Sequence, residues 1–244
     1  MIVLITTFGG ALLGMWLRAV MPARYFDAES RETVKVGIGL IATMTALVLG
    51  LVTASAKKSF DDVSTEMKGL ATQTLALDRA LARDGPETAE IRKELKQLIG
   101  TRIDMIWPQE ASRPVNIEPI QTSGEALAQA IRRLTPTDDS QRALQGRALD
   151  LAEAVLQNRW IVTTSAGASV PWPFLSVLVF WLTITFMSFG LMGARNAMVV
   201  SVLLLCALSV AAAVFLVLEM DGPFEGLLRV SPAPLRSAYE HLNQ

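Results

Sequence analysis

Histidine and cysteine are nearly missing from this sequence. His241 is the single histidine and Cys206 the single cysteine among 244 residues. Histidine-based metal sites need several imidazoles, and a Ser/His or Cys/His nucleophile needs a base beside it. One cysteine also excludes an intrachain disulfide. The sequence therefore predicts a protein that is not an enzyme, with no histidine- or cysteine-based metal site and no cofactor.

Phosphate-binding and nucleic-acid-binding patterns are missing as well. The sequence has no Walker loop, and Gly37 and Gly39 lie inside an apolar run with no preceding strand, unlike a dinucleotide-binding motif. The polar stretch 57–170 carries nearly equal numbers of acidic and basic residues. This balance gives no electrostatic reason to expect a nucleic-acid partner.

Long apolar segments are what the sequence has instead. Hydrophobic residues make up 51% of the chain, and a membrane helix needs about 20 of them in a row. Four segments reach that length and carry no charge deep inside: Ile2–Val20, Val36–Ala56, Phe174–Met192 and Met198–Leu218. The sequence thus predicts an all-α, four-span membrane protein in contact with lipid, with a helical polar region between the second and third spans.

The order of these segments predicts four parts of the chain: membrane helices one and two in 1–56, the polar helical region in 57–170, membrane helices three and four in 171–219, and a tail in 220–244. With four spans, both termini and the polar region share one side of the membrane. Basic residues near the span ends are slightly more numerous on that side. The positive-inside rule then favours a cytoplasmic location for the polar region and both termini.

The second apolar segment continues beyond the bilayer without a helix breaker. Lys57 and Lys58 mark the membrane edge, and no proline follows them before Pro86. Apolar residues then recur with the 3,4 alternation of a heptad, with Thr74 in one place of the series. They are Phe60, Val63, Met67, Leu70, Leu77 and Leu81. One helix is therefore predicted to run from the membrane to about Arg83.

Small residues continue the same stripe back into the membrane segment, where packing rather than the hydrophobic effect drives helix association. The residues predicted to pack between subunits are Gly39, Ala42, Ala46, Ala56 and Phe60. The residues predicted to line a pore are Thr45, Leu49, Val52 and Thr53. Apolar rings can form a dewetting constriction, and threonine hydroxyls can replace part of an ion's hydration shell.

Further helices are predicted in the polar region. One runs from Pro86 to Ile106, and an irregular proline-containing connector follows it up to Gly124. Thr122–Glu125 has the spacing of a capping box that opens a short helix, and a longer helix is expected over about 138–164.

Two local patterns near the membrane carry separate predictions. Gly10 and Gly14 have the spacing of a close-packing helix face. Glu219, Asp221 and Glu225 form an acidic cluster just past the last span. Their hard oxygen ligands suit a cation clasp, and a solvated turn at the membrane exit is the alternative interpretation.

Several stretches resemble the bacterial bestrophin-like family of membrane proteins over nearly the whole chain. The stretches that carry the resemblance are ESRETVKVGIGLIATMTALVLGLVTASAK at 29–57, ALDRALARDGPE at 76–87, IWP at 106–108, QRALQ at 141–145, PFLSVLVFWLTITFMSFGLMGARNA at 173–197 and ALSVAAAVFLVLEMDGPFEGLLRVSPAPLR at 207–236.

A more distant similarity to the bestrophin anion channels implies a pentamer of four-span subunits. It also implies a helical cytoplasmic region and a pore lined by each second span. MDGPF at 220–224 looks like the turn that follows the last span in bestrophins. Two features depart from that pattern. No aromatic residue lies between Val34 and Ser59, where bestrophins carry aromatics at the neck, and the acidic run after the last span is shortened to three residues.

The predicted function is a homo-oligomeric membrane ion channel that conducts small ions. The resemblance to bestrophins implies that these ions are anions. Two spans flanking a helical bundle are also typical of transmembrane sensors with a ligand-binding bundle. A non-conducting membrane scaffold is the third reading, because close-packing small residues serve both scaffold and channel.

Overall fold

The computed structural model describes residues 1–22, 28–107, 118–157, 172–224 and 226–244, with the backbone alone in 28–31 and 118–123. All regular structure in these residues is helical, which confirms the predicted all-α class. The helices are α1 (Ile2–Val20), α2 (Ala28–Asp84), η2 (Pro86–Thr88), α3 (Ala89–Ile106), α4 (Glu118–Arg132), α5 (Asp139–Gln157), α7 (Trp172–Met192), α8 (Ala197–Asp221) and α9 (Ala233–His241).

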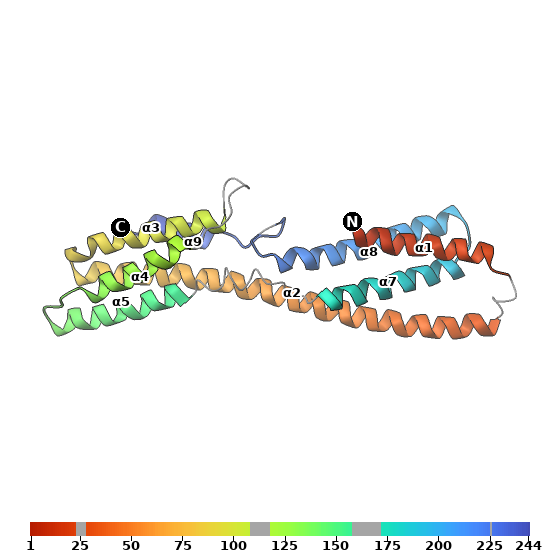
Figure 1. Ribbon diagram of the computed structural model, residues 1–244, viewed down its shortest axis with the longest axis horizontal. Helices are drawn as coiled ribbons and strands as arrows, with labels where there is room; N and C mark the ends of the chain where they lie inside the picture. The colour runs from red at the N-terminus through yellow and green to blue at the C-terminus, as the bar shows by residue number, and fades with distance from the viewer. Residues whose placement is uncertain (23–27, 108–117, 158–171, 225) are drawn as a thin grey trace. The chain divides into compact units, whose positions relative to one another are not determined.

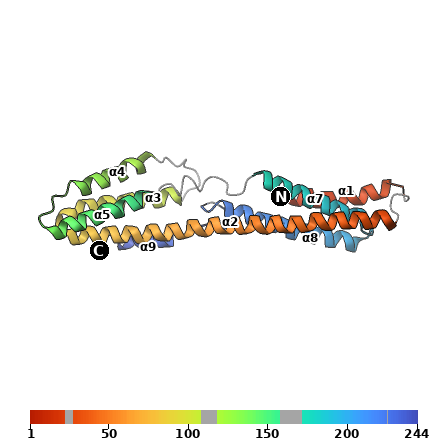
Figure 2. The ribbon, with the colours of Figure 1, turned by 90° about the horizontal axis from the view of Figure 1, so that it is seen from below.

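The chain divides into two compact units. The membrane unit consists of Met1–Ser59 and Ala168–Asp221, and the helical unit consists of Phe60–Gly167 and Gly222–Gln244. Helix α2 contributes its first part to the membrane unit and its second part to the helical unit. In the membrane unit, α1 lies beside α7 and α8 (Figure 1). In the helical unit, α3 lies beside α4 and α9, and α4 lies beside α5 (Figures 1 and 2).

Four helices are long and apolar enough to cross a membrane. They are α1, the apolar part of α2, α7 and α8, which confirms the four predicted spans. The turn between α7 and α8 holds only residues 193–196, so these two spans form an antiparallel hairpin.

Glycine lets α1 and α7 approach each other closely. A Cβ on Gly14 would lie 1.9 Å from the Met187 carbonyl oxygen, and one on Gly190 would lie 1.9 Å from the Ala11 carbonyl oxygen. A Cβ on Gly10 would lie 3.0 Å from the Thr183 carbonyl oxygen. The predicted close-packing face of Gly10 and Gly14 is therefore confirmed, and its partner is α7 of the same subunit.

Arg18 joins the end of α1 to the turn between α7 and α8. Its Nη1 donates hydrogen bonds to the carbonyl oxygens of Met192, at 3.0 Å, and of Gly193. A cation at the C-terminal end of α7 is also favoured by the helix dipole. On the other side of the turn, Asn196 Oδ1 caps α8 by accepting from the Val199 N–H at 2.8 Å.

The second part of α2 forms one wall of the helical unit's core. The heptad positions predicted from the sequence point into this core. Val63, Met67, Leu70, Thr74, Leu77 and Leu81 are buried, and Phe60 packs against the core at its edge. Helices α3, α4, α5 and α9 supply the other helical side chains of this core. The predicted continuation of the second span as a long helix is confirmed, since α2 has no break up to Asp84.

The end of α2 is a glycine turn held by a threonine. Gly85 adopts a positive φ of 134°, which suits a residue without a Cβ, and Pro86 opens η2. Thr88 is 1% exposed, and its Oγ1 hydroxyl contacts the carbonyl oxygens of Leu81 at 2.7 Å and Gly85 at 2.8 Å. The predicted stop and restart at Asp84–Glu87 is thus present.

Two predicted boundaries in the polar region differ from the structure. Helix α4 begins at Glu118, whereas the sequence predicted an irregular connector up to Gly124. The error has a physical cause: Pro119 lies in the first turn, where the missing N–H costs no helical hydrogen bond. Helix α5 extends to Gln157, and the rest of the helix predicted up to Thr164 falls outside the described residues.

Candidate functional site on the second helix

One face of the membrane part of α2 packs against the other spans of the same chain. Ile38, Thr45, Val52 and Ala56 form this buried face, and each is at most 8% exposed. Val48 and Leu49 flank it and pack against a cluster of Leu178, Leu182 and Val214 from α7 and α8. This face is the seam that joins α2 to the other spans of the subunit.

The four predicted pore residues fall into two pairs. Thr45 is 5% exposed and Val52 7% exposed, so both contact the subunit's own helices. The Thr45 Oγ1 hydroxyl donates to the Ile41 carbonyl oxygen at 2.7 Å. Leu49 and Thr53 are half-buried and lie at the edge of the buried face. Only these two present part of their surface outside the subunit.

The exposed side of the same helix is divided by side-chain size. One strip, here called the small-residue strip, follows helical spacing and consists of Gly39, Thr43, Ala46, Gly50 and Thr53. The neighbouring strip, here called the bulky strip, consists of Leu40, Met44, Leu47 and Leu51, each at least 49% exposed. Contact with lipid alone does not explain this division by size, because both strips are apolar enough to face lipid.

The glycines of the small-residue strip have open space around them. A Cβ built on Gly39 or Gly50 would meet nothing within 4 Å, in contrast to Gly14 and Gly190, which are enclosed by backbone. Among the predicted subunit-packing residues, Gly39 and Ala46 are exposed and Ala42 is half-buried. Ala56 is 0% exposed and Phe60 packs against the core of the helical unit, so both contact their own subunit.

Charges of both signs lie at each end of the small-residue strip. Lys35 precedes it by one helical turn and Glu32 by two, and Lys57 and Asp61 follow it at the same two spacings. All four side chains belong to exposed residues. Because each end carries one acidic and one basic residue, the charges there nearly cancel.

The acidic cluster after the last span is only partly described. Glu219 and Asp221 are half-buried in the last turn of α8, and Glu225 falls outside the described residues. Among the residues that the structure describes, no three His, Cys, Asp or Glu side chains are grouped so that they could hold a metal ion. The predicted cation clasp stays a prediction.

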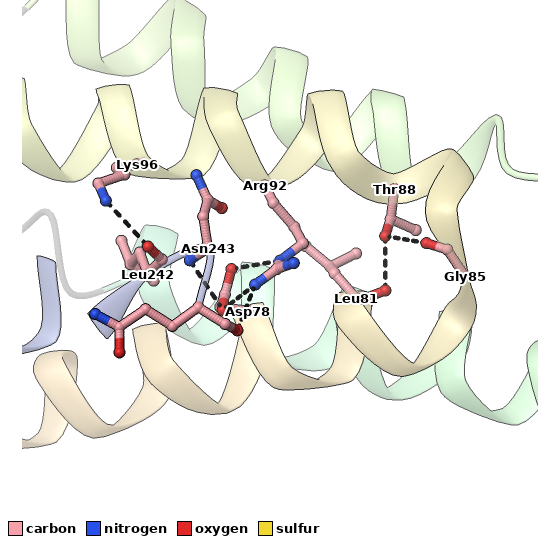
Figure 3. Close-up of polar contacts among 9 residues, drawn as sticks. Asp78, Leu81, Gly85, Thr88, Arg92, Lys96, Leu242 and Asn243 are labelled. Carbon is pink, nitrogen blue, oxygen red and sulfur yellow. Dashed lines mark hydrogen bonds and ion pairs between the residues drawn. The ribbon is translucent and has the colours of Figure 1, made fainter. Parts of the chain in front are cut away.

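A buried ion pair in the helical unit was not predicted from the sequence. Asp78, which is 3% exposed, accepts from Arg92 Nε at 2.8 Å and Arg92 Nη2 at 2.9 Å. Figure 3 shows the Arg92 guanidinium of α3 directed at this carboxylate on α2. The hydrogen bond from Arg92 to Asp78 raises the pKa of the guanidinium. The signal was present in the sequence: Asp78 follows Thr74 by one turn, on the buried face.

The C-terminal segment extends this polar cluster. The Asn243 N–H donates to Asp78 Oδ2 at 3.4 Å, and Lys96 Nζ donates to the Leu242 carbonyl oxygen at 3.0 Å (Figure 3). Lys96 also lies over the Tyr239 ring, 5.2 Å from its centroid. These contacts fix α9 against α2 and α3, and they give the cluster a structural role.

The segment after α8 is held by the end of α3. Trp107 Nε1 donates to the Val230 carbonyl oxygen at 3.0 Å, and the Trp107 ring lies edge-to-face with Phe224 at 6.0 Å between centroids. The Val230 N–H in turn donates to the Pro223 carbonyl oxygen at 2.8 Å. Trp107 and the Pro223–Phe224 pair, far apart in sequence, are therefore brought together here.

Comparisons with known proteins agree with this architecture. The sequence matches the family model described as Bestrophin-like domain over residues 5–235. The fold is similar to a crystal structure of a bacterial bestrophin homolog from Klebsiella pneumoniae, with a TM-score of 0.71 at 14% identity, covering 98% of this chain and 96% of that one. A mutant of that homolog gives a TM-score of 0.70 at 16% identity, covering 98% and 97%.

None of the curated protein sequences compared with the chain matches it. The structural matches concern the fold, and the family match spans nearly the whole chain, including all four membrane helices and the long continuation of the second. On this evidence the chain belongs to the bestrophin-like family of membrane proteins.

Proposed function

We propose that this protein is a homo-oligomeric ion channel of the bacterial inner membrane, and that the second helices of its subunits surround the conduction axis. Membership of the bestrophin-like family supports a channel rather than an enzyme. The similarity to bestrophin anion channels noted in the sequence supports a ring of five subunits. The polar region and both termini then lie in the cytoplasm.

The observation that carries the proposal is the low burial of α2. Only 11% of the residues in its membrane-spanning stretch are buried within the chain, against 28% for α1, 33% for α7 and 17% for α8. A helix so weakly enclosed has most of its surface left for lipid or for other subunits. Small side chains along one exposed strip favour other subunits, because they let helices approach closely in lipid.

The open glycines support the same arrangement. Gly39 and Gly50 are not needed for packing inside the subunit, since a Cβ on either would contact nothing. The bulky strip, by contrast, has the composition of a lipid-facing surface. In the proposed assembly the small-residue strip, which includes Thr53, faces the axis and the neighbouring subunit, and Leu49 lies at its edge.

The chemistry of the strip predicts weak ion selectivity. The Thr43 and Thr53 hydroxyls donate to the carbonyl oxygens of Gly39, at 2.8 Å, and Leu49, at 2.7 Å. Their oxygen lone pairs therefore remain to contact water or ions. The mixed charges at both ends favour neither sign strongly. We expect the channel to pass small anions and small cations at comparable rates, with its width as the main filter.

Planar-bilayer recording of the purified protein tests the proposal. We expect single-channel currents whose reversal potential shifts only slightly in a potassium chloride gradient. A folded, reconstituted oligomer that passes no current under any voltage would refute the channel, and it would favour the scaffold instead. A reversal potential near the chloride equilibrium value would support the anion selectivity that the resemblance implies and would contradict weak selectivity.

A matched pair of substitutions tests the role of the small-residue strip. Gly50→Phe adds a ring where the subunit itself has space, and Leu51→Phe adds one on the adjacent bulky strip, where the residue is already 67% exposed. We expect Gly50→Phe to abolish the current or to dissociate the oligomer, measured by mass in detergent, while Leu51→Phe retains both. Equal effects of the two substitutions would contradict the assignment of the strip to the axis.

A further inference from the structure

The loop that follows the last span is closed at its base. The Val230 N–H donates to the Pro223 carbonyl oxygen at 2.8 Å, which makes a short loop of the residues between them. The base is fixed by Trp107, whose Nε1 donates to the Val230 carbonyl oxygen and whose ring packs against Phe224. Pro223 and Val230 are both buried. The base of this loop is thus part of the helical unit's core.

The tip of the loop exposes apolar side chains. Leu227 is 83% exposed and Leu228 38% exposed. Gly226 takes a positive φ of 76°, and its carbonyl oxygen accepts from Arg229 Nε at 2.7 Å. That hydrogen bond holds the side chain of Arg229, which directly follows the two leucines in sequence, back against the loop. A single exposed leucine is ordinary on a protein surface, but two adjacent ones on a fixed tip are not.

The position of the tip in the chain identifies its surroundings. Helix α8 is a membrane span that ends at Asp221, and its last polar residues mark the membrane edge. Extended chain covers at most about 3.5 Å per residue, so Leu227 lies within about 20 Å of the end of the span. The interfacial layer beside the hydrocarbon core is itself several ångströms thick on each side, about 5–8 Å.

We propose that the Leu227–Leu228 tip inserts into the lipid interface at the membrane surface where α8 ends. Apolar side chains beside a basic residue suit such an interface, because the leucines enter the acyl boundary while Arg229 meets the phosphate headgroups and offsets the negative charge of Glu225 in the same loop. The tip then anchors the helical unit to the bilayer through Trp107. This inference concerns lipid contact and does not depend on ion conduction.

Fluorescent labelling tests the insertion. Cys206 is replaced by alanine, Leu227→Cys is labelled with an environment-sensitive NBD probe, and the protein is reconstituted in nanodiscs of phosphatidylethanolamine and phosphatidylglycerol. Asp139→Cys, at a side chain 96% exposed in the helical unit, is the aqueous control. Because insertion reaches about 5–10 Å into the interface, we expect shallow doxyl lipids to quench the Leu227 probe about threefold more than the control probe. Aqueous iodide should quench the control more strongly.

Two results would overturn the proposal. Strong iodide quenching of the Leu227 probe with no doxyl quenching would place the tip in water. Protection from both quenchers would show that protein, such as a second subunit, covers the tip. Arg229→Gln supplies an independent measurement in the labelled protein: we expect it to weaken doxyl quenching in nanodiscs with phosphatidylglycerol and to leave it unchanged in phosphatidylcholine. An unchanged signal in both lipids would remove arginine from the contact.

Discussion

Asp78 shows how a buried charge is satisfied between the helices of this protein. Both of its carboxylate oxygens accept from the planar Arg92 guanidinium, and the Asn243 N–H adds a longer contact. The arginine side chain is 17% exposed, whereas the carboxylate is 4% exposed. Removing the arginine would therefore leave a charge with little access to water.

Substitution of Arg92 by methionine should destabilise the helical unit by about 2–4 kcal/mol, since breaking a buried pair from one side leaves an uncompensated charge. Lys93→Met is the matched control, because its ion pair with Glu90 is solvent-exposed and should contribute less than about 1 kcal/mol. Chemical denaturation followed by circular dichroism gives both values. Asp78→Asn combined with Arg92→Met should recover part of the loss, and a full additive loss would contradict the pairing.

The carboxylate of Asp84, unlike that of Asp78, is destabilised by its surroundings in the folded protein. Partial burial, together with the negative charges of Glu87 and Asp138, raises its pKa above the ordinary 3.8. The folded protein thus holds this proton more tightly than the unfolded chain. The contribution of protonated Asp84 to folding stability is therefore fully present below pH 3.8, and it is lost as the pH rises through the pKa of this group in the folded protein. Asp84→Asn should remove this fall and raise stability at neutral pH by a few tenths of a kcal/mol, about the size of a screened like-charge pair.

Thermal unfolding of the wild type and Asp84→Asn across the pH range from just below 3.8 upward measures this difference. The two curves should converge at the acid end, where Asp84 is protonated. Divergence that grows toward acid pH would show that the carboxylate stabilises the fold and would contradict the prediction.

At the scale of elements, the close packing of α1 against α7 depends on glycine at the contact positions. The Gly14 and Gly190 positions each bring one helix against the backbone of the other. Gly14→Ala should therefore separate the helices and lower the melting temperature by several degrees, corresponding to about 1–3 kcal/mol for an overpacked site. Gly9→Ala on the same helix is the control, because a Cβ there meets nothing within 4 Å. Fluorescence-detected melting in detergent gives both values, and similar losses in the two variants would contradict the close-packing role.

The two parts of α2 differ in how well they could be predicted. Outside the membrane, polar residues separate Val63, Met67, Leu70, Leu77 and Leu81, so the buried face follows from their spacing alone. Inside the membrane, every side of the helix is apolar and the pattern carries no such contrast. For this reason the sequence did not reveal that Thr45 and Val52 contact the subunit's own helices, whereas the accessible strip contains Gly39, Ala46 and Gly50.

Side-chain contacts between distant segments were the least predictable. The IWP and GPF stretches were recognisable in sequence, but nothing in their spacing indicated that Trp107 contacts Phe224 and the Val230 carbonyl oxygen. Likewise, the polar cluster at Asp78 needs α9 to return to α3, a tertiary contact between remote residues. The candidate strip on α2 similarly requires knowing which face the other spans cover.

At the scale of the whole molecule, four spans place the α7–α8 turn on the side of the membrane opposite the helical unit. In a background of Cys206→Ala, Arg195→Cys in that turn and Asp139→Cys in the helical unit are both exposed labelling sites. With the proposed cytoplasmic helical unit, a membrane-impermeant maleimide added to intact spheroplasts should label Arg195→Cys and should label Asp139→Cys only after lysis. The reverse pattern would place the helical unit outside the cell, as a ligand-sensing bundle requires. Labelling of both sites in intact cells would contradict the four-span topology itself, because α7 is the single crossing between the helical unit and the turn and must place them on opposite sides.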